Sequence, residues 1–149
     1  MSVDKIVVRD VAPSDADAVA ALITELGHAT SADSIPSRLA KVNAQDGSAK
    51  LAIDEQGHAL GFMSLTSYAV LHAAGPVAVI TAFVVTEHAR GRGVGRQLVE
   101  VAKAWATARG CVRLIVTSGE SRAGAHAFYP ACGLTYTGRR FAITLSDAH

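Results

Sequence analysis

The spacing of apolar residues along the chain predicts an alternation of strands and helices. A β-branched run, Ile6 to Val8, lies within residues 3–11 and predicts a first strand. Ser14 follows it and can cap the first turn of a helix, and Gly27 is placed to end that helix in a left-handed conformation. The intervening apolar residues recur at the i, i+3, i+4, i+7 spacing of one helical face: Val19, Leu22, Ile23 and Leu26.

The next part of the chain predicts a second helix and a β-hairpin. Ser31 or Ser34 can cap this helix, Leu39 faces inward, and residues 43–47 end it. Two alternating apolar and polar segments follow, one at 51–53 and one from residue 60 towards residue 70, separated by a turn-forming stretch. This arrangement predicts an antiparallel pair of strands.

The second half of the chain continues the alternation. Residues 77–85 are apolar on both faces, which is typical of a central strand covered on two sides. A long helix is predicted over 93–109 and a strand over 112–116, followed by a helix from about 121 to 131. Alternation within 135–145 predicts closing strands, through Phe141, Ile143 and Leu145. The pattern as a whole predicts a mixed α/β protein.

Length and charge limit the classes of function. With 149 residues, half of them apolar, the chain can bury one core, and we expect a single domain over 1–149. Fourteen basic residues against thirteen acidic ones leave a net charge of +1. This balance gives no general electrostatic reason to bind nucleic acid or an anionic membrane, so any anion site must be local.

The cysteines and the amino terminus favour a cytoplasmic protein. Cys111 and Cys132 are too few for a disulfide framework, and no neighbouring Cys/His cluster has the spacing of metal ligands. The first residues lack the basic start and apolar run of a signal peptide, and no segment reaches the roughly 18 apolar residues of a membrane span. We therefore expect a soluble protein without a metal.

The segment from Val84 to Arg96 carries the candidate chemistry. It joins the apolar strand to the long helix through three glycines, Gly91, Gly93 and Gly95. Such a junction offers unpaired backbone amides and the positive end of a helix dipole, which is what a diphosphate requires. Three arginines concentrate positive charge there: Arg90, Arg92 and Arg96. A glycine-rich turn with solvated arginines is the alternative interpretation.

Two linked motifs resemble those of the GCN5-related N-acetyltransferase (GNAT) family. The glycines fit neither a P-loop nor a dinucleotide fingerprint, whereas residues 90–95, Arg-Gly-Arg-Gly-Val-Gly, match the family's Arg/Gln-x-x-Gly-x-Gly/Ala signature. Residues 122–134 are similar to its Ala-x-x-aromatic-Tyr-x-x-x-Gly-Phe helix. The resemblance implies a mostly antiparallel sheet of about seven strands, splayed between the fourth and fifth and flanked by about four helices.

The resemblance also implies acetyl-CoA as cosubstrate and assigns its contacts. The strand ending at Phe83, Val84 and Val85 would pair with the pantetheine arm, and an amide near Val85 would polarise the thioester carbonyl. The pyrophosphate would lie on the amides of residues 90–95, and Arg92 and Arg96 would reach outer phosphates. The residues of the expected cofactor loop are Arg90, Gly91, Arg92, Gly93, Val94, Gly95 and Arg96.

Tyr129 is the candidate general acid, because its phenol could protonate the departing thiolate; packing in the core is the alternative for it. Many family members carry a glutamate base on the central strand, where this chain has Thr81 and Ala82. The base candidates are therefore Glu120 and His126, followed by Glu87, His72 and His28, and each has an ordinary surface or structural role as its alternative. Arg122 stands where the family often has asparagine, so it could serve either the cofactor or the acceptor.

The acceptor is expected to be the primary amine of a small molecule, an amino-acid derivative or an aminoglycoside-like compound. Its site would be built from Leu26 to Leu39, the hairpin near Tyr68 to His72 and the loop before Tyr129. The low content of carboxylates in these segments argues mildly against a highly cationic acceptor. Acetylation of a protein amino terminus or lysine, and a sensor that binds acetyl-CoA without turnover, are the alternatives. The strands around Phe141 to Leu145 could pair across a homodimer.

Overall fold

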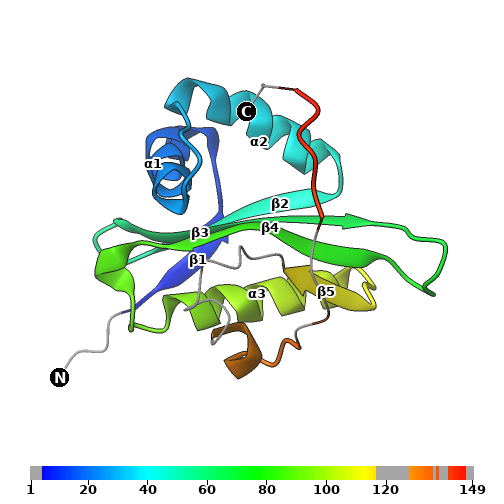
Figure 1. Ribbon diagram of the computed structural model, residues 1–149. Coiled ribbons are helices and arrows are strands. Elements are labelled where there is room, and N and C mark those ends of the chain that lie inside the picture. Colours follow the sequence, from blue (N-terminus) through cyan, green and yellow to red (C-terminus); the bar gives the residue numbers. More distant parts are fainter. Residues whose placement is uncertain (1–4, 117–127, 136, 138–140, 147–149) are drawn as a thin grey trace. The chain divides into compact units, whose positions relative to one another are not determined.

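The protein's structure, a computed structural model, describes residues 5–116, 128–135, 137 and 141–146 (Figure 1). The chain divides into two compact units, Met1–Val116 and Thr117–His149. The first unit contains one sheet with helices on both of its faces, and the second contains a helical segment at 128–131.

The sheet of the first unit has its five strands in the order in which they occur along the chain. They are β1 (Val7–Asp10), β2 (Gly47–Ile53), β3 (Ala59–Tyr68), β4 (Val77–Val85) and β5 (Arg113–Val116). Strands β1 to β4 are antiparallel to their neighbours, whereas β5 runs parallel to β4. The predicted hairpin at β2 and β3 and the predicted central strand at β4 are confirmed.

The expectation of about seven strands is wrong, because the described residues form five. The predicted closing strand through Phe141, Ile143 and Leu145 is not a strand, and these side chains are 95%, 84% and 91% exposed. An alternating sequence forms a strand only where a neighbouring strand completes its hydrogen bonds and one face is covered. Alternation alone does not supply either condition.

Strand β4 changes its surroundings halfway along its length. Its pairing with β5 runs from Val77 opposite Arg113 to Ile80 opposite Val116, so residues 81–85 have no partner strand on that side among the residues described. At the same point β4 bulges away from β3: Ser64 lies opposite Ala82 and Leu65 lies opposite Ile80, which leaves Thr81 as the extra residue. The first half of β4 is therefore paired with β5, and the second half is not paired with any described strand on that side. This change occurs between the fourth and fifth strands, where the sequence predicts that the sheet splays.

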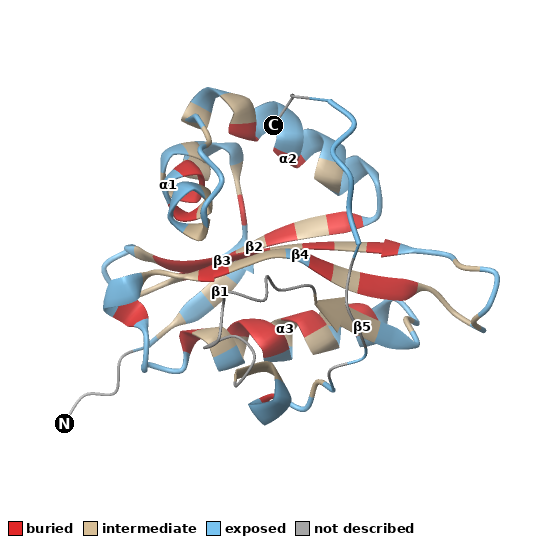
Figure 2. Cartoon of the chain, in the orientation of Figure 1, coloured by how far each residue is buried: buried red, intermediate tan, exposed pale blue. Residues whose placement is uncertain are grey.

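Helices cover both faces of this sheet (Figure 1). Helices α1 (Ala16–Leu26) and α2 (Ile35–Ala44) lie on one face, and α3 (Val94–Ala108) lies on the other. The first face buries Val19 and Leu39 with Leu51 and Phe62 of the sheet, and the second buries residues such as Leu98. Figure 2 shows these buried positions on the surfaces where helix and sheet meet. Covering on both faces explains why β4 is apolar on both.

Glycines end the helices where the sequence predicts. Gly27 follows α1 with a φ of 121°, and the amide of His28 donates to the Ile23 carbonyl at 3.2 Å. In the second unit Gly133 has a φ of 94°, and the Leu134 amide donates to the Tyr129 carbonyl at 3.0 Å. Both arrangements satisfy carbonyls at the end of a helix and need a residue that tolerates positive φ.

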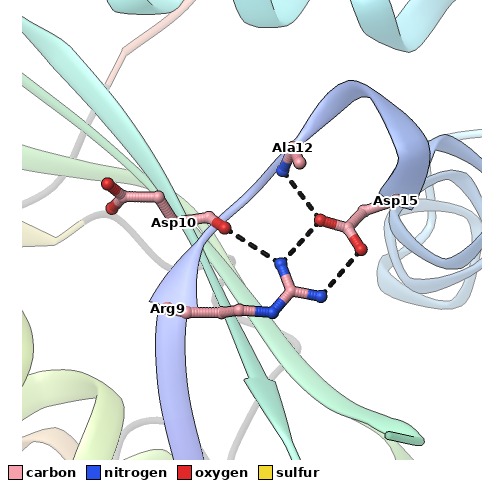
Figure 3. Close-up of polar contacts among 4 residues, drawn as sticks. All are labelled: Arg9, Asp10, Ala12 and Asp15. Atoms are coloured by element: carbon pink, nitrogen blue, oxygen red, sulfur yellow. Dashed lines mark hydrogen bonds and ion pairs between the residues drawn. The ribbon is translucent and has the colours of Figure 1, made fainter.

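An ion pair fixes the junction between β1 and α1 (Figure 3). Both terminal nitrogens of Arg9 donate to the Asp15 carboxylate, at 2.8 and 2.9 Å, and the Ala12 amide donates to the same carboxylate at 2.7 Å. The Asp15 side chain is only 13% exposed. Hydrogen bonding from Arg9 lowers the pKa of Asp15, and the Ala12 amide acts in the same direction. These contacts set the direction in which α1 leaves the sheet.

Candidate active site

The loop between β4 and α3 forms a left-handed turn at two glycines. After β4 a short 3-10 helix, η3 (Glu87–Ala89), precedes the turn. Gly91 and Gly93 have φ values of 83° and 79°, and a Cβ at either position would meet nothing within 4 Å. Backbone conformation, and not lack of space, therefore requires glycine at both positions. Gly93 is the residue immediately before α3, and its carbonyl accepts the Gln97 amide at 3.1 Å.

Four amides at this turn lack backbone partners within the described chain: those of Gly91, Gly93, Val94 and Gly95. The amides of Arg90 and Arg92 instead donate to the carbonyls of Glu87 and Ala89, each at 3.3 Å. Of the six amides from 90 to 95 that were expected to bind the pyrophosphate, four are therefore without a backbone partner among the residues described. Clustered unpaired amides at the start of a helix of 15 residues, where the dipole is positive, suit an anion such as a pyrophosphate.

The three arginines of the loop have different surroundings. Arg90 is 63% exposed, and its Nη2 lies 4.0 Å from Oε2 of Glu25, so its charge is partly compensated. Arg92, just before α3, and Arg96, in its first turn, are both exposed. All three arginines lie within six residues of the turn, so the sequence concentrates basic side chains there.

Glu25, in the last turn of α1, is hydrogen-bonded to the start of the loop between β4 and α3. The sequence analysis did not identify Glu25 as a residue of this site. Its Oε1 accepts the Thr86 hydroxyl at 2.9 Å and its Oε2 accepts the Glu87 amide at 3.1 Å. A carboxylate near the carboxyl end of a helix is opposed by the helix dipole and needs local compensation. The position of Glu25 near the end of the helix indicates that it needs a partner. The sequence does not show that Thr86 and Glu87, 61 and 62 positions away, provide it.

The second half of β4 forms one wall of the region. Val84 is buried at 2% exposure opposite Phe62, whereas Phe83 and Val85 are partly buried and pack against the core on the α3 side. These are the three residues expected to pair with pantetheine. Beyond Ile80 no described strand pairs with this edge of β4, and the edge of a strand presents alternating amides and carbonyls that can pair with an amide-containing chain.

A cavity of about 200 Å³ lies between α1, α2 and the sheet. Most of its lining is apolar and comes from both helices and from β2, β3 and β4, including Ile23, Leu39 and Phe62. Ile35, Arg38 and Leu39 of the predicted acceptor segment also line it, whereas Tyr68 to His72 do not. Two residues of the β4 bulge, Thr81 and Ala82, complete the wall. The cavity and the cofactor loop are thus connected by one strand.

The roles of the predicted catalytic residues stay predictions. Tyr129 belongs to the second unit, where its ring makes an edge contact with Phe128 at 5.4 Å between centroids, and its role as general acid stays a prediction. Glu120, Arg122 and His126 lie outside the described residues. None of the other base candidates, Glu87, His72 and His28, lines the cavity.

The part of the chain that the structure describes contains no group of three or more His, Cys, Asp or Glu placed to hold a metal ion. It also contains no helix that combines the length and the apolar character needed to cross a membrane.

Comparison with known proteins identifies relatives of this fold. The chain is 33% identical over 87 residues to an aminoglycoside N(6')-acetyltransferase of Klebsiella aerogenes, a match that spans 57% of each chain. A crystal structure of a Trypanosoma brucei acetyltransferase superposes with a TM-score of 0.83 at 21% identity, covering 95% of this chain and all of the other. An aminoglycoside N-acetyltransferase in complex with CoA superposes with a TM-score of 0.82 at 19% identity, covering 95% of both chains.

The family model for the acetyltransferase (GNAT) family matches residues 19–134, which is most of the chain and includes both predicted motifs. The five-stranded mixed sheet, with helices on both faces, agrees with the fold of the solved relatives. The resemblance predicted from residues 90–95 and 122–134 is therefore confirmed: the chain belongs to the acetyltransferase (GNAT) family.

Proposed function

We propose that this protein transfers the acetyl group of acetyl-CoA to the primary amine of a small molecule. The observation that carries this proposal is the turn at Gly91 and Gly93, where four amides at the amino end of α3 have no backbone partner among the residues described. Membership of the family and the CoA bound to one structural relative support acetyl-CoA as the cosubstrate.

The pyrophosphate would lie on the amides of Gly91, Gly93, Val94 and Gly95, with Arg92 and Arg96 contributing positive charge. The pantetheine arm would run along Phe83 to Val85, where β4 has no further partner strand among the residues described. The cosubstrate supplies an activated acyl group as a thioester. In this arrangement the thioester would reach the part of β4 that borders the cavity.

The acceptor amine would enter from the cavity and attack the thioester carbonyl carbon. The C–N bond forms as the C–S bond breaks, the amine gives up one proton, and the thiolate takes one. We propose that the Val85 amide polarises the carbonyl and that Tyr129 supplies the proton to sulfur. Glu120 or His126 would accept the proton of the amine, directly or through water.

The relative from Klebsiella aerogenes supports a small-molecule acceptor, because its name gives aminoglycosides as its substrates. The cavity supports it as well, because its volume suits part of a small molecule and not a folded protein surface. One observation favours a sensor without turnover: β4 carries Thr81, and not a carboxylate, at the bulge beside the cavity.

Release of free CoA thiol, measured over a panel of primary amines, tests the proposal. We expect turnover that depends on both acetyl-CoA and one class of amine. Saturable acetyl-CoA binding with no turnover of any amine would contradict catalysis and favour the sensor.

A further inference from the structure

The cavity beside the β4 bulge points to the class of acceptor. We propose that it takes an arylalkyl or branched alkyl primary amine, with one apolar group and a single ammonium, and that it excludes polyamines and aminoglycosides. This inference rests on the proposed function, because it places the acceptor in this cavity.

The lining of the cavity is that of an apolar pocket. Val19, Leu39 and Phe62 contribute to it and are 2%, 7% and 4% exposed, so they belong to the core and their positions are fixed by packing. Its hydroxyl groups come from Ser64 and Thr81 at the bulge, where the Thr81 hydroxyl donates to the Ser64 carbonyl at 3.3 Å. An apolar group gains free energy by entering such a cavity, whereas a polar group loses hydrogen bonds with water.

The charge of the lining disfavours a polycation. Among the described residues that line the cavity, Arg38 is the one with a charged side chain, and none is Asp or Glu. Moving an ammonium into an apolar site without a carboxylate partner costs more free energy than moving a neutral polar group there. A molecule with several ammonium groups would pay this penalty for each group that it buries.

The same environment favours the reactive form of a singly charged amine. Low polarity disfavours the ammonium relative to the neutral amine, so burial in the cavity lowers the pKa of a bound amine. The neutral amine is the nucleophile. An apolar acceptor cavity therefore reduces the need for a carboxylate base on β4, where this chain has Thr81.

The volume of the cavity fits one ring. At about 200 Å³ it is larger than an engineered apolar cavity of about 150 Å³ that binds benzene. It is smaller than the range of about 300–1,000 Å³ that is usual for drug-sized ligands, so a compound of several sugar rings does not fit inside it. A phenyl group or a branched alkyl group does.

The distance along β4 from the cavity to Val85 limits the length of the spacer between the acceptor's apolar group and its amine. Ala82 lines the cavity, and Val85, proposed to polarise the thioester, lies three residues further along the strand. At about 3.3 Å per residue this separation is roughly 10 Å. An amine on a short alkyl spacer would extend from the cavity towards the thioester.

The test compares the thiol-release kinetics of 2-phenylethylamine and 3-methylbutylamine with those of spermidine and kanamycin. We expect kcat/KM at least tenfold higher for the two apolar amines. A higher kcat/KM for spermidine or kanamycin would overturn the inference while leaving the proposed acetyltransferase activity intact.

Two matched charge variants on α2 test whether the cavity determines the preference for apolar amines. Arg38→Glu adds a carboxylate to the lining, whereas Lys41→Glu makes the same charge change at an exposed position of α2 outside the lining. We expect Arg38→Glu to narrow the preference for apolar amines over spermidine at least fivefold and Lys41→Glu to leave it unchanged. Equal effects of the two variants would contradict selection in the cavity.

Binding without turnover separates this inference from the proposed function. 2-Phenylethanol is an uncharged analogue that cannot be N-acetylated, and its binding can be followed by chemical shifts of methyl groups. We expect saturable shifts at Ile23 and Leu39 for 2-phenylethanol and none for kanamycin, even in a protein that shows no turnover. Absence of shifts at these residues with 2-phenylethanol would overturn the inference.

Discussion

At the scale of single residues, Glu25 shows how an acidic side chain can support an anion site. Its two oxygens accept the Thr86 hydroxyl and the Glu87 amide, and these residues begin the segment that leads into the turn at Gly91. It also lies 4.0 Å from Arg90, so it orients one arginine of the loop. We therefore propose Glu25 as a positioning residue for the loop that is proposed to bind the cofactor.

Replacing Glu25 tests this role. Glu25→Ala removes both hydrogen bonds, and we expect the Kd for acetyl-CoA to rise about tenfold, because one hydrogen bond to a charged group is worth about 1.5 kcal/mol. Glu25→Gln keeps an acceptor oxygen and should have a smaller effect. Titration calorimetry measures both, and an unchanged Kd in Glu25→Ala would show that the loop holds its shape without this residue.

Gly93→Ala tests the left-handed turn. Alanine at a φ of 79° should lower the free energy of unfolding by about 1 kcal/mol. It should also raise the Kd for acetyl-CoA, because the amides around residue 93 would shift to relieve the strain. Gly57→Ala is the matched control, since Gly57 has a φ of 85° in the turn between β2 and β3 and a Cβ there also meets nothing within 4 Å.

Chemical denaturation and calorimetry on the two glycine variants separate stability from binding. We expect similar losses of stability and a weaker affinity in Gly93→Ala alone. If Gly57→Ala weakens binding as much, the effect belongs to general destabilisation and not to the loop.

The glycine turn between β4 and α3 could be predicted from sequence because glycines and arginines concentrate in one short segment. The sequence could not show which amides are already paired, since the bonds of Arg90 and Arg92 to Glu87 and Ala89 depend on the path of the chain. Nor could it join Glu25 to Thr86. Contacts between distant segments follow from packing, which no local pattern records.

At the scale of elements, the junction of β1 and α1 positions one wall of the cavity. The Arg9 guanidinium and the Ala12 amide converge on the Asp15 carboxylate, and Val11 and Val19 on either side of this junction line the cavity. The direction of α1 and the shape of the cavity thus depend on the same contacts.

Asp15→Asn should lower the free energy of unfolding by about 1–2 kcal/mol at neutral pH. The pKa of Asp15 is lowered in the folded protein, mainly by hydrogen bonding from Arg9. Its stabilisation is therefore complete above the ordinary carboxyl pKa of about 4 and is lost as the pH falls through the lowered value. The difference between wild type and Asp15→Asn should shrink below about pH 4.

Denaturation curves at a series of pH values measure this difference, with Asp17→Asn as the control. Asp17 is exposed in the first turn of the same helix, so the control makes the same change in charge without the ion pair to Arg9. A difference that stays constant with pH, or an equal loss in Asp17→Asn, would contradict the role of the carboxylate.

Periodicity predicted the helices because each has one clear buried face, and the apolar run predicted β4 because both of its faces are covered. Helix α1 buries Val19 and Leu22 and ends at Gly27, and β4 spans the predicted residues 77–85. The prediction failed at Phe141 to Leu145, which alternate without a buried face. The bulge at Thr81 was also unpredictable, because it depends on the register between β3 and β4.

At the scale of the whole molecule, the first unit combines a proposed anion site and an apolar cavity on opposite faces of its sheet. The turn leads into α3 on one face, while the cavity lies under α1 and α2 on the other. Strand β4 contributes to both. A thioester lying along residues 83–85 would be accessible to an amine from the cavity, which is the basis of the proposed acetyl transfer.

Titration calorimetry with acetyl-CoA and with S-acetylpantetheine, which lacks the nucleotide and pyrophosphate, tests the central claim most directly. The amides at Gly91 to Gly95 are proposed to bind the pyrophosphate, so acetyl-CoA should bind saturably, at one site per chain, and at least tenfold more tightly than S-acetylpantetheine. Its affinity should also fall with added salt. Equal affinities for the two ligands, or no saturable binding of acetyl-CoA, would contradict the claim.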